Sequence, residues 1–469
     1  MNTKDTNKAT RINIFSFKAP HMRTFHLSWI SFFFCFFGWF GIAPLMAIVR
    51  EELSLTQTQI GNVIIASVAI TVIARIFIGR FCDKYGPRLT YTVLLILGSI
   101  PVIGIGLSNS YESFLLFRLA IGVIGASFVI TQYHTSVMFA DNVVGTANAT
   151  TAGWGNMGGG ATQMIMPLIF TGFVFLGFED SSAWRLAMIV PGVAMIVLGI
   201  LYYKYTTDTP NGNFSELKAA SIAETEGGSA KSGISMLTVL KDYRVWALFL
   251  IYGTCFGIEL TINNIAAIYY HDYFDLSLQN AGLIAGLFGL MNLFARSTGG
   301  YLGDRFGIKF GLKGRVMFLF VTLLLEGVAL IVFSQMAVLT MAVGSMIVFS
   351  LFVQMAEGAT FSVVPFVNRK AVGAVSGIVG AGGNAGAVAA GFLFRYESIP
   401  YGDALFILGC VVAVCSFTAF LVRFSARDEI EARWEMNESL RVRDEFDKSL
   451  ERELAEINEQ ELEPVEVEK

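Results

Sequence analysis

The feature that most constrains the fold of this chain is a series of long apolar runs. We count twelve of them, at residues 27–49, 60–79, 89–107, 114–139, 144–169, 186–203, 245–270, 278–299, 315–333, 337–366, 371–394 and 402–422. About 20 apolar residues in a helix cross the hydrocarbon core of a bilayer. The runs are continuous rather than alternating and twice as long as a barrel strand, which favours helices over a β-barrel. We therefore predict an all-α membrane protein with twelve transmembrane helices.

The composition and the termini agree with a membrane protein. The chain has 469 residues, of which 15% are charged, whereas a soluble protein carries about 25%. The first 26 residues are polar and basic and the first apolar run is full length, so we expect no cleavable signal peptide. The five cysteines lie in or beside apolar runs without zinc spacing. We expect no structural disulfide and no metal site.

Lysine and arginine residues predict the topology, because they are enriched in cytoplasmic loops. If the N-terminus is cytoplasmic, the cytoplasmic segments before the tail hold nineteen of them. The external loops then hold three, Arg50, Arg185 and Arg395. We predict a multi-pass protein of the plasma membrane, or of the inner membrane in a bacterium, with both termini in the cytoplasm.

The chain also repeats itself. Ala74–Gly86 and Ala295–Gly307 both read A-R-x-x-x-G-x-x-x-D-[KR]-x-G, and a G-N-x-G segment follows each of them at a similar offset. Two repeated pairs in the same order predict two pseudo-symmetric halves of six helices, an organisation typical of secondary transporters. We predict a cytoplasmic N-terminus at 1–26, halves at 27–203 and 245–422, a cytoplasmic linker at 204–244 and a charged cytoplasmic tail at 423–469.

The repeated loop resembles the signature loop of the major facilitator superfamily. We expect Gly79 and Gly300 to let two helices approach closely. We expect Asp83 and Asp304, the latter followed by Arg305, to cap a neighbouring helix or to pair with a base, and so to latch one conformation. These residues are interpreted as structural and gating, not as substrate ligands.

Two arginines are predicted to lie deep in the membrane, Arg75 in the second span and Arg296 in the eighth. Each costs about 2.5–3.5 kcal/mol on insertion scales and therefore needs a partner or a wet cavity. Their equivalent positions in the two halves should place them face to face, and neither span contains an acid. The acids within spans are Glu259, Glu326 and Glu357, all in the second half. Each arginine is either an ion-pair partner within its own half or part of an anion site, to which guanidinium donors are well suited.

Two glycine-rich runs, AGWGNMGGGA at 152–161 and GAGGNAGA at 380–387, each hold one asparagine. Small residues let transmembrane helices pack closely, and we assign helix packing to Gly155, Gly158, Gly159, Gly383 and Gly386. Asn156 and Asn384 must find hydrogen bonds if they are buried. Both roles stay open for them: ligands of an anion, or links between helices.

These segments resemble the signatures of the nitrate/nitrite porter family within that superfamily. The match also covers Phe352–Phe366 in the tenth span and Tyr252–Asn264 in the seventh. The resemblance implies that two arginines hold nitrate with the help of aromatic residues and a tyrosine of the seventh helix. Carried over, the substrate-binding residues are Arg75, Arg296, Tyr252, Asn156, Asn384, Phe128 and Phe256.

Nitrate is flat, monovalent and weakly hydrated, and a slot between aromatic rings with donors in its plane suits it better than phosphate. We therefore expect a transporter that imports nitrate, and nitrite with it, by alternating access within the lipid bilayer. The alternatives are a nitrate/nitrite exchanger, a carrier of another anion, and a membrane anion sensor that does not transport. The sequence shows no catalytic triad or cofactor loop, so we expect no enzyme, no cofactor and no nucleic-acid partner.

An anion that enters a negative cytoplasm moves uphill, by about 2.3 kcal/mol per charge per 100 mV. Either proton symport or exchange for nitrite can drive it. Glu259 is the first candidate for proton coupling, because it lies seven residues after Tyr252 on the same helix face and resembles the glutamate of the proton-linked branch. Its alternative role is a polar residue satisfied at a helix contact. His134 and Glu357 are further candidates, and Arg118, which resembles an arginine motif of the superfamily's fourth helix, has a structural or coupling role.

The tail is acidic, with sixteen acids against seven bases in residues 424–469. Such a charge run is typical of a solvated, partly disordered tail. A regulatory helix that docks an accessory partner is the alternative, and the sequence does not choose between them.

Overall fold

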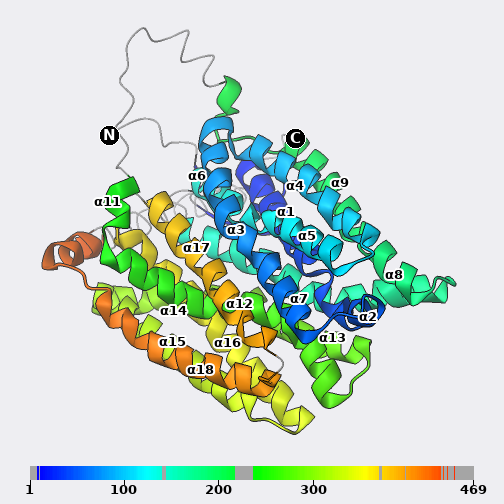
Figure 1. The fold of residues 1–469 in the computed structure, drawn as a ribbon. Coiled ribbons are helices and arrows are strands. Elements are labelled where there is room, and N and C mark those ends of the chain that lie inside the picture. The colour runs from blue at the N-terminus through cyan, green and yellow to red at the C-terminus, as the bar shows by residue number, and fades with distance from the viewer. Residues whose placement is uncertain are drawn as a thin grey trace, which may run out of the picture.

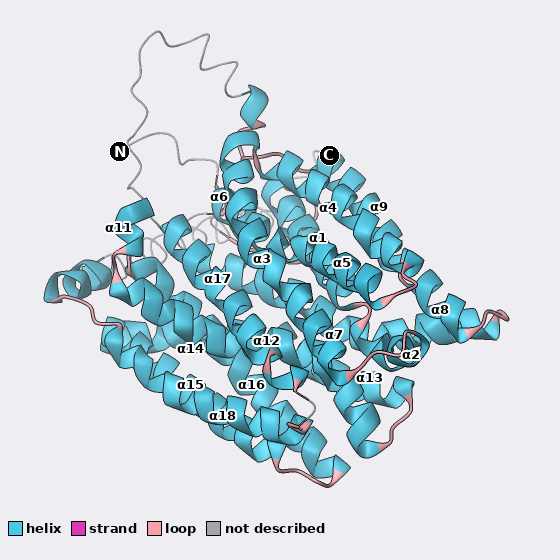
Figure 2. Ribbon diagram, viewed as in Figure 1, coloured by secondary structure: helices cyan, strands magenta, loops and turns pink. Residues whose placement is uncertain are grey.

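A computed structural model describes residues 8–9, 11–139, 144–216, 236–368, 372–396 and 398–434, with 437, 441 and 448. Within these residues, 12 helical spans are long and apolar enough to cross a membrane, which confirms the predicted all-α fold. Figure 2 shows these spans as helices joined by loops and turns. The predicted linker is described only at its two ends, and most of the acidic tail lies outside the described residues.

The first six spans are built from nine α-helices: α1 (Pro20–Phe40), α2 (Met46–Glu52), α3 (Gln57–Tyr85), α4 (Pro87–Gly104), α5 (Tyr111–Ile121), α6 (Ser127–Met138), α7 (Val144–Phe175), and α8 (Asp180–Ala187) continued by α9 (Ile189–Tyr205). A short helix, α11 (Met236–Leu240), precedes the other six. These are α12 (Tyr243–Phe274), α13 (Leu278–Leu290) continued by α14 (Ala295–Phe310), α15 (Leu312–Ser334), α16 (Leu339–Val363), α17 (Val372–Gly391) and α18 (Tyr401–Ser416).

The spans form two groups that meet along two matched contacts. In Figure 1 the first six, which run from blue through cyan to teal-green, lie together, and the last six, green to orange, lie beside them. Between the groups, α3 packs against α17, and α7 packs against α13 and α14. These are the second and eleventh spans and the fifth and eighth, so exchanging the two groups exchanges the two contacts. We call the end that carries Pro20 and Leu421 the terminal end, and the opposite end the loop end.

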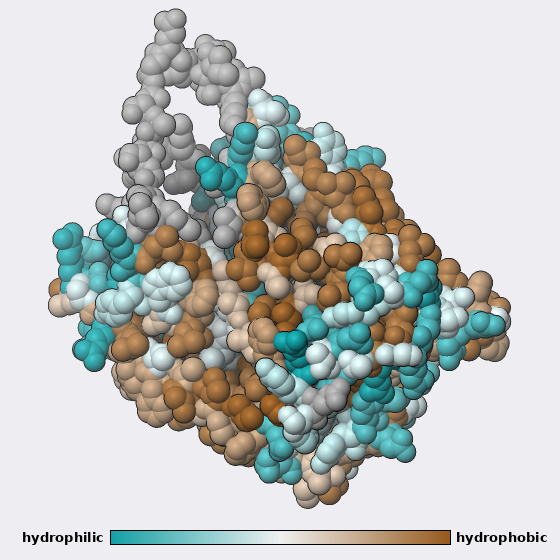
Figure 3. All heavy atoms as spheres, viewed as in Figure 1, coloured by the Kyte–Doolittle hydropathy of each residue, from teal (hydrophilic) through white to brown (hydrophobic). Residues whose placement is uncertain are grey.

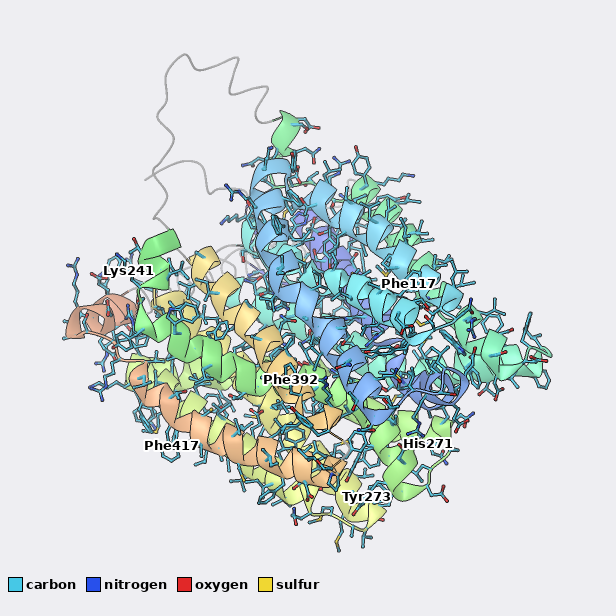
Figure 4. The ribbon with its side chains drawn as sticks, viewed as in Figure 1. Phe117, Lys241, His271, Tyr273, Phe392 and Phe417 are labelled. Carbon is cyan, nitrogen blue, oxygen red and sulfur yellow. The ribbon has the colours of Figure 1, made fainter. Side chains whose placement is uncertain are left out.

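The surface of the bundle is apolar between its two ends. Figure 3 shows brown side chains over the spans on the visible face and teal ones gathered at the helix ends and loops. Leu97, Ile100 and Leu116 are each more than half exposed. In Figure 4, Lys241 lies at the terminal end of the second group and His271 and Tyr273 at its loop end. This pattern fits a belt of lipid around the spans, since apolar side chains are stable there and charges are not.

The glycine-rich runs are helix-packing surfaces, and they make equivalent contacts in the two groups. A Cβ atom at Gly158 would collide with the backbone of Phe33 in α1, and one at Gly386 with the backbone of Gly253 in α12. At the other three glycines assigned to helix packing, a Cβ atom would meet side chains: that of Phe32 at Gly155, that of Asn263 at Gly159, and that of Phe256 at Gly383. The fifth span therefore packs on the first as the eleventh packs on the seventh.

The expectation for Gly79 and Gly300 is wrong in this conformation. A Cβ atom would lie 3.7 Å from Val129 at Gly79 and 3.9 Å from Ala149 at Gly300, which are ordinary van der Waals distances. The close approach occurs one residue earlier, where a Cβ atom at Gly299 would collide with the backbone of Met355. Sequence alone does not fix which of two adjacent glycines faces the neighbouring helix.

The repeated loop is held by carboxylates, but not only by the predicted ones. Asp304 pairs with Arg315 of α15, which is one of the two roles expected for it. Arg305 donates from Nε to the Tyr301 hydroxyl at 2.9 Å, and the side chain of Asp83 lies outside the described residues.

The capping role falls to residues that follow the sixth span of each group. Asp208 Oδ1 accepts from the Arg88 backbone N–H at 2.9 Å. Glu429 accepts from the backbone N–H groups of Leu312, at 2.9 Å, and Lys313, at 3.0 Å. A carboxylate at the start of a helix satisfies free N–H groups and the helix dipole. The chain that follows the last span is thereby tied to the start of α15.

Candidate functional site

Two of the spans are interrupted where the candidate residues lie. The fourth span breaks at a 3₁₀ turn, Gly122–Ala126, and the eighth at Met291–Leu293. Phe128 is the second residue of α6 after the first break, and Arg296 the second residue of α14 after the other. Interrupted helices free backbone groups at mid-span and are typical of transporter binding sites. Neither break was predicted from the sequence.

The structure brings the two membrane arginines together. The Cζ atom of Arg75 lies 5.1 Å from the centre of the Phe128 ring and 5.6 Å from that of Phe256. The Cζ atom of Arg296 lies 5.9 Å from the centre of each of the same rings. Both arginines are buried, 4% and 2% exposed. One guanidinium from each half therefore faces one shared pair of aromatic rings.

Arg75 uses only part of its hydrogen-bonding capacity among the described residues. Its Nη1 donates to the backbone oxygen of Gly380 in α17 at 2.6 Å. Its Nε and Nη2 are buried and have no hydrogen-bond partner among the described residues. An unsatisfied buried donor costs about 1–3 kcal/mol, and more when it is charged. Asn384 lies close by, since its Nδ2 is 3.5 Å from the same Gly380 oxygen. Arg75 is thus a cation that can accept a ligand.

Arg296 is already paired. Its Nη1 donates to Glu357 Oε2 at 2.5 Å and its Nη2 to the Tyr252 hydroxyl at 2.8 Å. This ion pair lies within the second half. Of the two roles left open for the arginines, an ion pair within the same half is therefore observed for Arg296 and not for Arg75. The absence of an acid in the eighth span did not exclude this pair, because Glu357 comes from the tenth, where Gly358 lets α16 approach the backbone of Arg296.

Aromatic rings wall the space around the arginines. The rings of Tyr252 and Phe256 stack at 5.1 Å and 16°, and those of Phe128 and Phe256 at 6.4 Å and 30°. Phe361 adds an edge contact to Tyr252 at 5.1 Å and 80°. Phe361 was not among the residues predicted from the sequence. Its spacing of four from Glu357 places it on the same face of α16, but 41 phenylalanines in the chain hide such a signal.

The asparagine of the fifth span links the two halves. Asn156 Nδ2 donates to Glu259 Oε2 at 3.2 Å, and Asn292 Nδ2 donates to Glu259 Oε1 at 2.6 Å. The Asn156 donor is therefore used by a helix contact in this conformation, and its Oδ1 has no hydrogen-bond partner among the described residues. Glu259 holds a first-half amide and a second-half amide at once. Asn292, in the break of the eighth span, was not anticipated.

The two other coupling candidates lie in different surroundings. Arg118 donates from Nη1 to the Trp39 backbone oxygen at 2.8 Å and from Nη2 to Asn264 Oδ1 at 3.0 Å, and so joins the halves. His134 shares hydrogen bonds with the Tyr202 hydroxyl at 2.6 Å and the Thr207 oxygen at 2.8 Å, both within the first half. The structure does not bring His134 to the arginine pair.

The loop end of the bundle is tied shut. Arg50 pairs with Asp272 at 2.6 Å across the two halves. Gln57 donates to the Phe394 oxygen at 3.0 Å, and Gln163 donates to the Asn263 oxygen at 2.6 Å, again across the halves. With both arginines buried as well, this conformation is occluded from the loop end.

Twelve spans in two matched groups around a buried polar centre define a secondary transporter of the major facilitator type. The fold resembles a bacterial homologue of the human lysosomal transporter Spinster in an inward-facing, unoccupied conformation, with a TM-score of 0.67 and 15% identity over 89% of this chain and 99% of that one. It also resembles the proton:xylose symporter XylE, with a TM-score of 0.64 and 14% identity. That match covers 88% of this chain and 99% of the XylE chain. At such identities the likeness shows the fold alone.

Sequence comparison narrows the class. The family model of the Major Facilitator Superfamily matches residues 28–391. High affinity nitrate transporter 2.5 of Arabidopsis thaliana is 41% identical over 89% of this chain and 83% of its own. High-affinity nitrate transporter 2.3 of Oryza sativa subsp. japonica is 39% identical over 89% of this chain and 80% of its own. The nitrate/nitrite transporter NrtP of Picosynechococcus sp. is 30% identical over 78% of this chain and 83% of its own. The chain belongs to the nitrate/nitrite porter family of the major facilitator superfamily.

Proposed function

We propose that this protein imports nitrate, and nitrite with it, by alternating access. The observation that carries the proposal is the arginine pair: Arg75 and Arg296, one from each half, over the same rings of Phe128 and Phe256. A planar anion between two guanidinium groups receives donors in its own plane. Because the donors come from both halves, one anion can hold the halves together, as an alternating-access carrier requires.

Arg75 is the first of the two to bind the anion. Its free Nε and Nη2 offer charge-assisted hydrogen bonds to two oxygens of one anion. The Phe128 and Phe256 rings keep water away from the site, which strengthens those bonds. Tyr252 and Arg296 complete the site once the anion reaches the second half.

We propose that Glu357 couples the anion to protons. Glu357 occupies Nη1 of Arg296, and an anion that needs this donor must displace it. A displaced carboxylate in the membrane interior is costly unless it takes up a proton. Binding of the anion and binding of a proton thus become linked through one guanidinium. Exchange of nitrate for nitrite would need no such carboxyl, and His134 is bonded elsewhere.

We further propose that the protein is a carrier of the plasma membrane with both termini in the cytoplasm, so that the loop end faces outside. The excess of basic residues at the terminal end supports this orientation. In that orientation the occluded loop end is the outer gate. The transporter family of the relatives supports a carrier over an enzyme or a sensor.

Uptake by purified protein in proteoliposomes tests the function. We expect nitrate to accumulate when the outside is more acidic, with competition by unlabelled nitrate and nitrite and little by formate. Glu357→Gln should abolish the dependence on the pH gradient, whereas Ser345→Ala, at a partly exposed site of the same helix, should not. Binding of nitrate without any accumulation would identify a sensor, and accumulation driven only by internal nitrite would identify an exchanger.

A further inference from the structure

A third carboxyl group lies buried beside the arginine–glutamate pair, and the anion site does not use it. Glu326, in α15, is 0% exposed. Within the part of the chain that the structure describes, neither of its carboxyl oxygens has a hydrogen-bond partner. Glu259 and Glu357, by contrast, are both held by amides or by an arginine. Glu326 is therefore unusual even among the buried acids of this protein.

The surroundings of Glu326 do not favour a negative charge. Among the described residues, the titratable groups that interact electrostatically with Glu326 are the thiol of Cys255 and the carboxyl groups of Glu259 and Glu357. On its own helix, the hydroxyl of Thr322 is directed to backbone oxygens of the preceding turn. The next residue, Gly327, packs against the backbone of Ala413 in α18. No cation that would neutralise a carboxylate has a contact with Glu326 among the described residues.

A carboxylate without partners is strongly disfavoured in such a place. Burying an isolated ionised carboxyl in a medium of low dielectric costs far more than burying the neutral acid, and the group takes up a proton instead.

We propose that Glu326 is a proton-binding site of this transporter, and that its proton exchanges with Glu357 when the anion replaces Glu357 on Arg296. The proposal rests on the proposed nitrate transport and extends it by naming the residue that holds the proton before and after the anion binds. The proton leaves the carboxyl group of Glu326 and binds the carboxylate released from Arg296. A proton from the aqueous side then refills Glu326, so that no charge stays unpaired.

The test separates anion binding from proton coupling. Wild type, Glu326→Gln and the control Thr322→Val, one turn away and equally buried, are each reconstituted. Three quantities are measured: nitrate affinity, exchange of external for internal nitrate, and accumulation driven by a pH gradient. We expect Glu326→Gln to keep affinity and exchange within about threefold of wild type and to lose at least tenfold of the gradient-driven accumulation. Thr322→Val should behave as wild type in all three.

Each other outcome has a definite meaning. If Glu326→Gln accumulates nitrate under a pH gradient as well as wild type does, the proposal is overturned. If it also loses affinity, Glu326 supports the anion site instead, and the proposal is again overturned. If wild type itself neither binds nor exchanges nitrate, the proposed function fails first. A second readout needs no transport: the infrared band of a protonated carboxylic acid should be present in wild type and weakened in Glu326→Gln.

Discussion

Replacing Arg75 by lysine removes the fork of donors and keeps the charge, so it isolates what the geometry contributes. The Nη1 of Arg75 is used by the Gly380 oxygen, and its Nε and Nη2 are free. A lysine ammonium is a compact charge that cannot reproduce the planar fork. We expect the anion to lose one of its two charge-assisted hydrogen bonds. Such a bond contributes about 1.5–3 kcal/mol.

That loss corresponds to an increase of about 10- to 150-fold in the dissociation constant of nitrate. Titration calorimetry on purified protein measures it directly, and tracer uptake at low nitrate should fall in parallel. Arg80→Lys, at an exposed arginine of the same helix, is the matched control and should bind as wild type does. Unchanged nitrate affinity in Arg75→Lys would refute the assignment, because the free donors would then have no ligand.

Three further predictions concern the frame of the site. Gly386→Ala should weaken transport at least tenfold and lower the melting temperature, because the added Cβ atom collides with α12, whereas Gly377→Ala on the same helix meets open space and should be neutral in both assays. Glu429→Gln should lower the free energy of unfolding by about 1 kcal/mol, because the charge at the start of α15 is lost. Thermal unfolding in detergent compares this variant with the control Glu431→Gln, and equal melting temperatures of the two variants would contradict the cap. Phe256→Leu should raise the nitrate dissociation constant about threefold to tenfold by removing a ring that both guanidinium groups face, and an unchanged constant would show that the ring only fills space.

Much of the fold could be predicted because the bilayer imposes simple rules. Length and apolarity alone locate all twelve spans, since a membrane helix must satisfy its own backbone. The repeat then relates positions that are far apart in sequence, and it correctly brings Arg75 and Arg296 to one centre. The same logic fails for detail on one helix face. It assigned the close approach to Gly300, whereas the structure places it at Gly299.

The partners of the buried polar groups could not be predicted, because they depend on which helices touch. Glu357 reaches Arg296 from the tenth span, and nothing in the sequence links the two residues. Asn292 donates to Glu259 from the break of the eighth span, and a 3₁₀ turn of three residues leaves no clear mark in an apolar run. Asp208 and Glu429 cap helices from segments that looked like linker and tail. Acidic residues in polar segments usually face water, so composition gave no reason to select them.

The contacts between the halves also suggest how the site controls the gates. Glu259 joins Asn156 to Asn292, and Arg118 joins Trp39 to Asn264. Both are polar links across the interface, and both lie in the interior, where a broken hydrogen bond is costly. An anion that reorganises Arg296 and Glu357 therefore acts next to the bonds that hold the halves together.

The central claim is that one flat anion lies between Arg75 and Arg296. The most direct test is a high-resolution map of the protein with saturating nitrate, compared with a map of the protein without it. The account predicts a planar density in contact with both guanidinium groups, bounded by the rings of Phe128 and Phe256, with Glu357 moved away from Arg296. Nitrate bound elsewhere, or bound with the Arg296–Glu357 pair intact and Arg75 still without a ligand, would contradict it.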